Sequence, residues 1–390
     1  MKKKLLAAAI AGAFAVPGVA LADGSSVTIS GFFKVGIESY NIGSSVGRAN
    51  SSEMRLTDNS SRIIFNVKED LGGGLSAIAQ LDTRFNPTTT GGATWGTGNT
   101  WVGMHSNDWG NITIGNRDLH YFHTADTIPG GATALDAWSV GILGFVNPDV
   151  GGTVKNAFNN VPIASDTRTP NVIEYASPKW GVFDFGLAWS ANRAGSPTDM
   201  GAPGVATGSG LPVTRKGQAW NFAPEIHTGP WWLGYSYWKS EADPSAATEP
   251  DQRSDRIWGF YNFPQGFHVG FTWDKSRIND AANGTKYADR NAWSIPLSYS
   301  WGPHSIGWTY TRANDDKVAG SSTGAKLNSV YYQYALSKRT QVAVTYANLN
   351  NDSKAAYNLF ATGLGSGDVA SPLTPGEDPR ALQFTLNHSF

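Results

Sequence analysis

Residues 293–301 read WSIPLSYSW, and large apolar side chains alternate strictly with small ones along this stretch. Side chains of an extended strand point to opposite faces in turn, so one face carries only apolar residues. That face consists of Trp293, Ile295, Leu297, Tyr299 and Trp301, and it bears no charge. Tryptophan at both ends of an apolar face is typical of a strand that crosses a membrane, because aromatic rings gather at the two interfaces.

The same period-two pattern recurs in residues 267–273, 306–310 and 342–346. Each apolar face lacks Lys and Arg, which cost about 2–4 kcal/mol at the middle of a bilayer. A soluble sandwich also alternates, but its apolar faces rarely stay this aromatic over so many strands. The pattern therefore favours an all-β, transmembrane antiparallel β-barrel, with a soluble all-β protein as the alternative.

The first residues predict the compartment. Lys2, Lys3 and Lys4 precede an apolar run over residues 5–16, and residues 20–22 supply the small-residue pattern that signal peptidase reads. A helix needs roughly 20 apolar residues to span a bilayer, so this run is too short. We expect residues 1–22 to be a cleaved signal peptide, with cleavage near Ala22, and residues 23–390 to form a single barrel domain.

Composition excludes several classes of function. Loss of three leader lysines leaves 27 of the 30 basic residues against 31 acidic ones, a net charge of about −4. That balance argues against a nucleic-acid binder, which carries a strongly basic surface. The chain has no cysteine, so disulfides and thiol catalysis are excluded.

The connections between strands divide into short turns and long loops. Seven tight turns are expected at residues 72–74, 108–110, 179–181, 228–230, 264–266, 302–303 and 337–339. Eight longer stretches lie between them, at residues 41–60, 86–98, 118–166, 192–215, 240–254, 279–289, 314–326 and 348–379. Fifteen connections join sixteen strands. An even strand count, short periplasmic turns and long outer loops are typical of bacterial outer-membrane barrels.

The third loop, residues 118–166, is far longer than a structureless connection normally is. It is also too apolar and aromatic to be disordered. We expect it to fold inward against the barrel wall, with a short helix near residues 133–143. An external lid over the barrel mouth is the alternative.

Several motifs, in order along the chain, resemble one family. They are Ser61-Arg62, EDLGGGL at 69–75, AIAQL at 77–81, TIG at 113–115, YALSKRT at 334–340 and the terminal Phe390. In this order they resemble the Gram-negative outer-membrane general porins, especially the betaproteobacterial trimeric type. The resemblance implies a homotrimer in outer-membrane lipid and lipopolysaccharide, with a third loop that narrows each pore. It also implies that the barrel assembly machinery recognises Phe390.

The resemblance places basic residues of the pore wall opposite acids of the third loop. Arg62 and Arg168 match wall arginines of the family, and period two independently places Arg84 on the lumen side with Arg62. Arg117 follows Gly115 one residue later than the family pattern, which predicts a turn away from the lumen. Asp126 and Asp136 are the expected loop acids.

The resulting function is a passive channel for small hydrophilic solutes and ions, with no cofactor. A substrate-selective porin is an alternative, in which Tyr121, Phe122, Trp138 and Phe145 of the third loop form an aromatic track. A barrel enzyme is a further alternative, but no nucleophile elbow, Walker loop or dinucleotide fingerprint occurs. His120 and His123 are the one close histidine pair, and without nearby Cys or clustered carboxylates they predict no metal site.

Overall fold

The computed structural model describes residues 24–44, 50, 52–88, 95–126, 131–146, 161–162, 168–191, 218–241, 251–280, 283–359 and 374–390. The signal peptide predicted for residues 1–22 lies outside these residues. Within them, no helix has the length and apolar character needed to cross a membrane.

The described chain is built almost entirely from strands. The strands are β1 (Ser26–Asn41), β2 (Ser52–Asp58), β3 (Arg62–Gly72), β4 (Leu75–Arg84), β5 (Thr100–Ser106), β6 (Gly110–Arg117), β7 (Phe145–Val146), β8 (Val161–Pro162), β9 (Thr169–Ala176), β10 (Phe183–Ser190), β11 (Gln218–Thr228), β12 (Trp231–Glu241), β13 (Asp251–Asn262), β14 (Phe267–Asn279), β15 (Lys286–Trp301), β16 (His304–Ala313), β17 (Ala325–Ala335), β18 (Thr340–Asn351) and β19 (Arg380–Ser389). Three short helical segments lie in the third loop: η1 (His120–Phe122), η2 (Leu135–Ala137) and α2 (Val140–Leu143).

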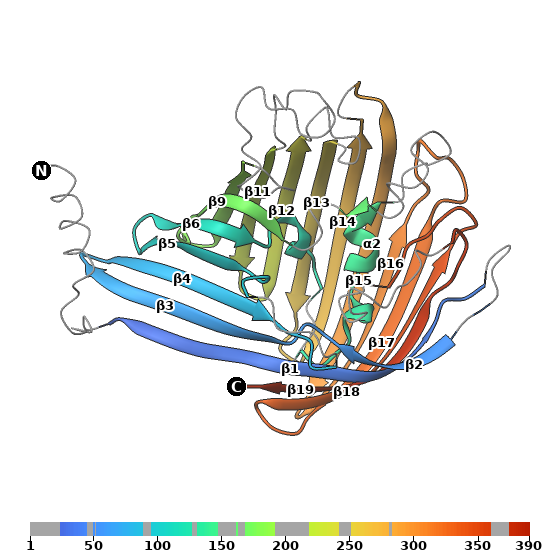
Figure 1. Ribbon diagram of the computed structural model, residues 1–390, viewed down its shortest axis with the longest axis horizontal. Coiled ribbons are helices and arrows are strands. Elements are labelled where there is room, and N and C mark those ends of the chain that lie inside the picture. The colour runs from blue at the N-terminus through green and yellow to red at the C-terminus, as the bar shows by residue number, and fades with distance from the viewer. Residues whose placement is uncertain are drawn as a thin grey trace, which may run out of the picture.

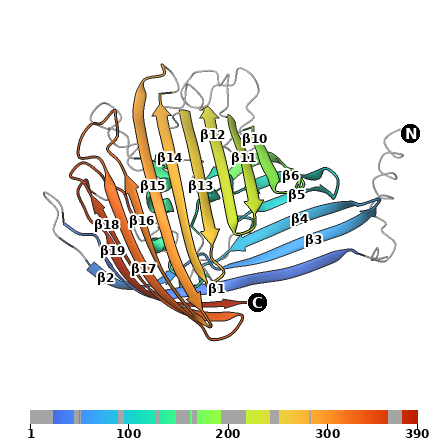
Figure 2. The same cartoon turned by 180° about the vertical axis from the view of Figure 1, so that it is seen from behind.

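The main sheet closes on itself. Each strand pairs antiparallel with its neighbours along the chain, and β1 also pairs with β19, from Phe32 opposite Ser389 to Asn41 opposite Arg380. The terminal Phe390 continues this seam, since its N–H donates to the Gly31 carbonyl at 3.1 Å. Figures 1 and 2 show the result as one curved wall, in which β11–β15 rise higher than β5 and β6.

The barrel has sixteen strands, as the turn count predicts. The sheet contains 17 segments, but β2 and β3 both pair with β1 and form one strand interrupted between them. Ser60 lies in this interruption with a φ of 75°. The prediction of a loop over residues 41–60 was therefore wrong for β2, which extends the wall beyond the break.

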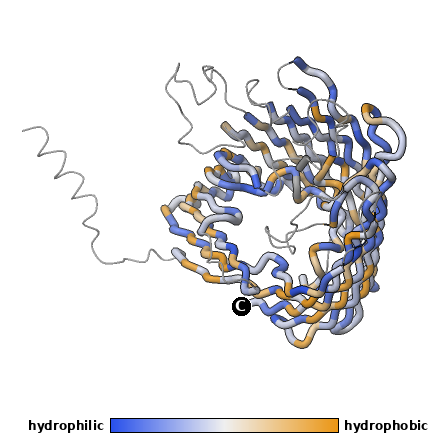
Figure 3. Tube along the Cα trace, turned by 45° about the vertical axis from the view of Figure 1, so that its right-hand side comes forward, coloured by the Kyte–Doolittle hydropathy of each residue, from blue (hydrophilic) through white to orange (hydrophobic). Residues whose placement is uncertain are grey.

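The alternation predicted from sequence separates the two faces of the wall. Along β14, Phe267 is 52% exposed and Phe271 is 48% exposed, whereas Thr272 is fully buried. Figure 3 shows hydrophobic and hydrophilic residues alternating along the strands. The exposed apolar side chains face outward, where the lipid of a membrane would lie, and the polar ones face the interior.

All seven predicted tight turns connect neighbouring strands at one end of the barrel. Three of the predicted long loops are shorter than expected by four residues or more, because β13 begins at Asp251, β15 begins at Lys286 and β18 continues to Asn351. These strands therefore extend past the predicted loop boundaries at the other end of the barrel. The third loop begins at that same end, after β6, and turns inward.

Candidate pore constriction

The main described parts of the third loop, residues 118–126 and 131–146, lie inside the barrel, where their backbone bonds to inward-facing side chains of the wall. Ala125 N donates to Thr272 Oγ1 on β14 at 2.8 Å, and Ala132 N donates to Gln333 Oε1 on β17 at 2.9 Å. Leu135 N donates to Asn59 Oδ1 at the break between β2 and β3, at 3.1 Å. These partners lie on several sides of the interior. The inward fold is therefore confirmed, and the external-lid alternative is wrong.

The helix predicted near residues 133–143 is present as two short pieces, η2 and α2. Ile142 and Leu143 of α2 are fully buried, and they pack with Ala292 of β15, Ala313 of β16 and Leu327 of β17. The small inward-facing residues Ala292 and Ala313 leave the room that the helix occupies. Apolar packing therefore fixes this part of the loop against the wall.

A buried charge cluster holds the same part of the loop. Arg256 of β13 and Arg290 of β15 both donate to Asp274 of β14, each at 3.0 Å. Arg256 also donates to the Leu143 carbonyl at 3.0 Å, and Arg290 donates to the Ile142 carbonyl at 2.8 Å. These carbonyls lie at the C-terminal end of α2, where helix carbonyls lack the usual partner four residues on, and that of Ile142 also accepts from Gly144 N. The three charged side chains, here named the loop latch, therefore cap the loop helix from the wall.

The beginning of the loop is anchored by His120. Its Nδ1 bonds to Ser236 Oγ and its Nε2 to Ser254 Oγ, both at 2.8 Å, and its carbonyl accepts from Arg256 at 3.0 Å. Burial, together with the nearby Arg256 guanidinium, lowers the pKa of His120 to about 3. The imidazole is therefore neutral at physiological pH and serves as an uncharged anchor.

The predicted wall arginines of β3 and β4 come together beside this loop. Arg62 and Arg84 lie opposite one another in the strand register. Arg62 reaches Asp82 Oδ2 at 3.4 Å, and Arg84 reaches Asp82 Oδ1 at 3.1 Å. Both guanidinium groups also donate to the Ser60 hydroxyl. Ser60, at the break between β2 and β3, therefore supplies a hydroxyl oxygen that holds the two guanidinium groups close together.

Arg168 joins the same group from the far end of the third loop. Its Nε lies 3.9 Å from Asp118 Oδ1, and Asn99 donates to the other oxygen of Asp118 at 2.7 Å. Burial raises the pKa of Asp118, and the Arg168 guanidinium opposes that increase. The guanidinium groups of Arg62, Arg84 and Arg168 also lie close enough to repel one another. We name these three residues the arginine cluster.

Arg117 lies on the interior face, contrary to the predicted turn away from the lumen. It forms an ion pair with Glu174 at 2.5 Å and lies over the Trp101 ring at 5.0 Å. The register of β6 and β9 shifts between Gly115 and Arg117. β9 contributes the extra residue of this bulge, so β6 keeps its alternation, and Arg117 lies on the same inward face as Thr113 and Gly115 with its charge paired.

Of the two predicted loop acids, Asp136 is buried and Asp126 is partly exposed. Asp136 is 3% exposed and interacts with Glu38 of β1, and Arg55 of β2 pairs with Glu38 at 2.5 Å. Asp126 accepts a hydrogen bond from Ser139 N at 3.0 Å within the loop. Burial raises the pKa of Asp126 to about 6. Both acids therefore contact protein groups that position the loop.

The loop aromatics form a small cluster of their own. Phe122 packs edge-to-face against Trp138, with ring centroids 6.2 Å apart. Trp138 and Phe145 pack against the buried pair Leu135 and Val140. Phe122 is 47% exposed. For Tyr121, the described part of the chain gives only its backbone position in η1.

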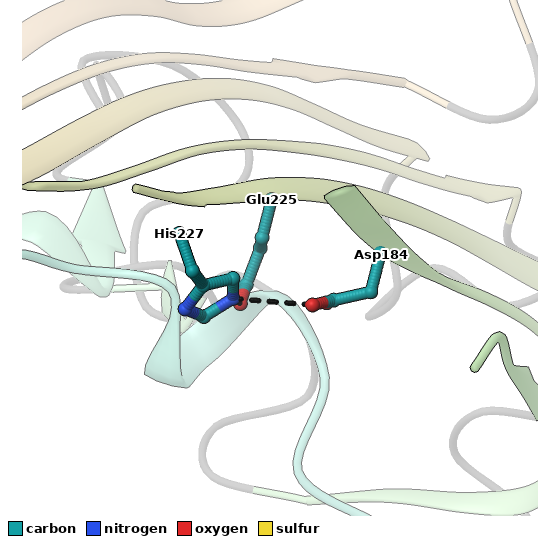
Figure 4. Close-up of side chains that lie close together, drawn as sticks. All are labelled: Asp184, Glu225 and His227. Atoms are coloured by element: carbon teal, nitrogen blue, oxygen red, sulfur yellow. Dashed lines mark ion pairs between the residues drawn. The ribbon is translucent and has the colours of Figure 1, made fainter. Parts of the chain in front are cut away.

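One group of side chains in the described residues has the composition of a metal site. Asp184 of β10 and Glu225 and His227 of β11 place one ligand atom each within 4.8 Å of one another. Figure 4 shows these side chains converging from the two adjacent strands. His123 of the third loop also reaches Glu225, at 3.4 Å.

A closed sixteen-stranded barrel with an apolar outer face and a loop folded into its interior defines an outer-membrane channel. Residues 6–354 match the family model of the Gram-negative porins. The chain therefore belongs to this family, and it is a passive channel of the Gram-negative outer membrane. The family is one of channels rather than enzymes.

One curated porin is similar to this chain in sequence, and two solved structures share its fold. An outer membrane porin protein of Bordetella pertussis is 28% identical and covers 88% of this chain and 92% of its own length. The anion-selective porin from Comamonas acidovorans has a TM-score of 0.68 at 18% identity, over 94% of this chain and all of that one. The trimer form of an outer membrane protein of Vibrio cholerae has a TM-score of 0.62 at 11% identity, over 94% of this chain and 99% of that one.

Proposed function

We propose that this porin passes small hydrophilic solutes and ions with a weak preference for anions, set where the third loop meets the arginine cluster. The observation that supports this is a local excess of positive charge. Three arginines and Lys34 share three carboxylates, Asp58, Asp82 and Asp118, and each arginine side chain is 17–20% exposed. A charge at a narrow pore acts on ions within a Debye length of about 8–10 Å.

In this proposal the loop acids shape the constriction without forming its negative side. Asp136 is held against Glu38 and Asp126 against Ser139, so neither supplies a free counter-charge to the arginine cluster. Their role is to fix the position of the loop. The excess charge of the cluster then acts on the permeating ion.

A substrate-selective channel with an aromatic track receives less support. Trp138 and Phe145 pack into the interior of the loop, which leaves Phe122 as the exposed ring among those whose side chains are described. A stacking track needs several exposed rings in sequence. We therefore favour the channel of broad specificity.

Replacing Arg62 with alanine is expected to reduce the anion preference. The interaction energy between a permeating ion and a unit charge about 8 Å away in water is about 0.5 kcal/mol. Screening by physiological salt reduces this energy to about 0.2 kcal/mol. The effect has opposite sign for anions and cations, so the anion-to-cation permeability ratio should fall roughly two-fold. Reversal potentials of the purified protein in planar bilayers, under a salt gradient, measure this ratio.

The matched control is Arg253→Ala, which removes the same charge from the half-exposed end of an ion pair with Asp255. It should leave the ratio unchanged. An Arg62→Ala channel with the wild-type reversal potential, or an equal shift in both variants, would contradict the role of the arginine cluster.

We further propose a homotrimer that contacts outer-membrane lipid and lipopolysaccharide, inserted by the barrel assembly machinery through Phe390. The trimeric Vibrio cholerae structure with the same fold supports the assembly state. Phe390 lies at the barrel seam, with its ring 6.0 Å from that of Phe33. Phe390 therefore contacts both terminal strands, as expected for a residue that the assembly machinery recognises while the barrel closes.

Deletion of Phe390 is expected to lower the amount of folded barrel in the outer membrane several-fold, because both the signal and a seam contact are lost. The heat-modifiable fraction on gels measures the folded form. Phe390→Tyr keeps an aromatic terminus and should assemble normally; equal assembly of the deletion variant and the wild type would refute the role of Phe390.

A further inference from the structure

The group formed by Asp184, Glu225 and His227 lies on the inner face of the barrel at the end with short turns. Asp184 is the second residue of β10, and it lies directly opposite Glu225 in the register with β11. His227 is one residue from the end of β11, on the same face as Glu225. Because the short turns of such barrels are periplasmic, the group lies near the periplasmic exit.

The distances within the group fit a small tetrahedral ion. His227 Nε2 lies 3.2 Å from Asp184 Oδ2 and 3.3 Å from Glu225 Oε2. Ligand bonds of about 2.0–2.1 Å in a tetrahedral site place neighbouring ligand atoms about 3.3–3.4 Å apart. Three protein ligands would leave one position for water. The side chains are 16–28% exposed, so an ion can enter from the lumen.

Neighbouring groups orient the candidate ligands. The Trp232 indole N–H donates to Glu225 Oε2 at 3.1 Å, and the Trp232 ring lies 4.3 Å from that of His227. On the other side, His123 Nδ1 of the third loop lies 3.4 Å from Glu225 Oε1. Hydrogen bonds of this kind hold carboxylate ligands in place and strengthen metal binding.

We propose that Asp184, Glu225 and His227 bind a divalent transition-metal ion of the Zn²⁺ type, with His123 as a positioning residue. One imidazole and two carboxylates suit Zn²⁺ better than Mg²⁺, which prefers oxygen ligands alone and retains its water. The bound ion would neutralise two acidic charges at the periplasmic exit. Through Glu225 and His123, it would also connect the wall to the third loop.

Titration of the untagged, EDTA-dialysed trimer in detergent with Zn²⁺, followed by calorimetry, tests the site. Binding is expected for wild type and lost in His227→Ala and Asp184→Asn. His123→Ala should weaken it roughly 10–100-fold, as expected for loss of a group that orients a ligand. His304→Ala is the matched control, because His304 lies at the same end of the barrel and bonds to the Tyr332 hydroxyl. It should bind as wild type does.

Single-channel recording gives a second readout, and this part rests on the proposed function. Zn²⁺ should shift the reversal potential toward anions in wild type and leave His227→Ala unchanged. Equal Zn²⁺ affinity in wild type and His227→Ala, no Zn²⁺ binding by wild type, or equally tight Mg²⁺ binding would overturn the site. A wild-type protein that fails to conduct in EDTA would instead refute the channel function and leave the binding result standing.

Discussion

Asp274→Asn should destabilise the barrel by roughly 3–5 kcal/mol, because removing one partner leaves buried charge uncompensated. Asp274 is fully buried and accepts from Arg256, Arg290, Ser254 and Ser276. Without the carboxylate, the two buried arginines repel each other beside the carbonyls that end α2. The third loop should then leave the wall, and the open-channel conductance should change together with the stability.

Thermal unfolding followed by circular dichroism in detergent, together with single-channel conductance, measures both effects. Asp255→Asn is the control, since Asp255 pairs with the half-exposed Arg253 at the surface. Exposed pairs contribute about 1 kcal/mol or less. Equal unfolding midpoints for the two variants would contradict the loop latch. A changed midpoint with the wild-type conductance would show that the latch supports the wall without holding the loop.

Asp136→Asn should make the protein more stable than wild type at alkaline pH. Burial, and then the neighbouring Glu38 carboxylate, raise the pKa of Asp136 well above its usual range. A carboxyl group whose pKa is higher in the folded than in the unfolded state stabilises the folded state while it is protonated. This stabilisation is complete below the unfolded-state pKa of about 4, and it is lost as the pH rises through the folded-state pKa. A folded-state pKa that lies one pH unit above the unfolded-state pKa corresponds to about 1.4 kcal/mol. Asparagine is uncharged at every pH and does not incur this loss.

The measurement is the unfolding midpoint at about pH 5 and about pH 9, both above the unfolded-state pKa of about 4. Wild type should lose stability between these values, and Asp136→Asn should lose less. Asp108→Asn, in an exposed turn, should follow wild type. If Asp136→Asn and wild type show the same pH dependence, Asp136 is ionised in the folded protein at neutral pH.

The strands and their number could be predicted because the information is local. A lipid-facing strand must alternate, and a tight turn needs particular residues, so each signal lies within about ten residues of sequence. The prediction failed at β2, where Met54 and Leu56 are the outward residues. Two apolar positions that alternate with the charged Glu53 and Arg55 are too few to show a period. The strand therefore looked like a loop.

The site was only partly predictable, because its contacts depend on register and on the path of a long loop. Period two placed Arg62 and Arg84 on one face, and their pairing follows from the short turn between β3 and β4. The loop latch was missed, since Arg256, Asp274 and Arg290 each look like ordinary water-facing residues of separate strands. Inward-facing charges at opposite or diagonal positions of three successive strands were the available signal. The burial of Asp136 against Glu38 had no comparable signal, as the two are far apart in sequence.

The seam between β1 and β19 has a consequence for biogenesis. Tyr40 pairs with Ala381, so closure joins segments from opposite ends of the chain. Contacts between residues this far apart in the sequence raise the contact order and form slowly. Until they form, both terminal strands present unpaired backbone edges that can add foreign strands. The chain must therefore remain shielded from aggregation throughout its periplasmic transit, and ring closure is expected to be the last and slowest step of maturation.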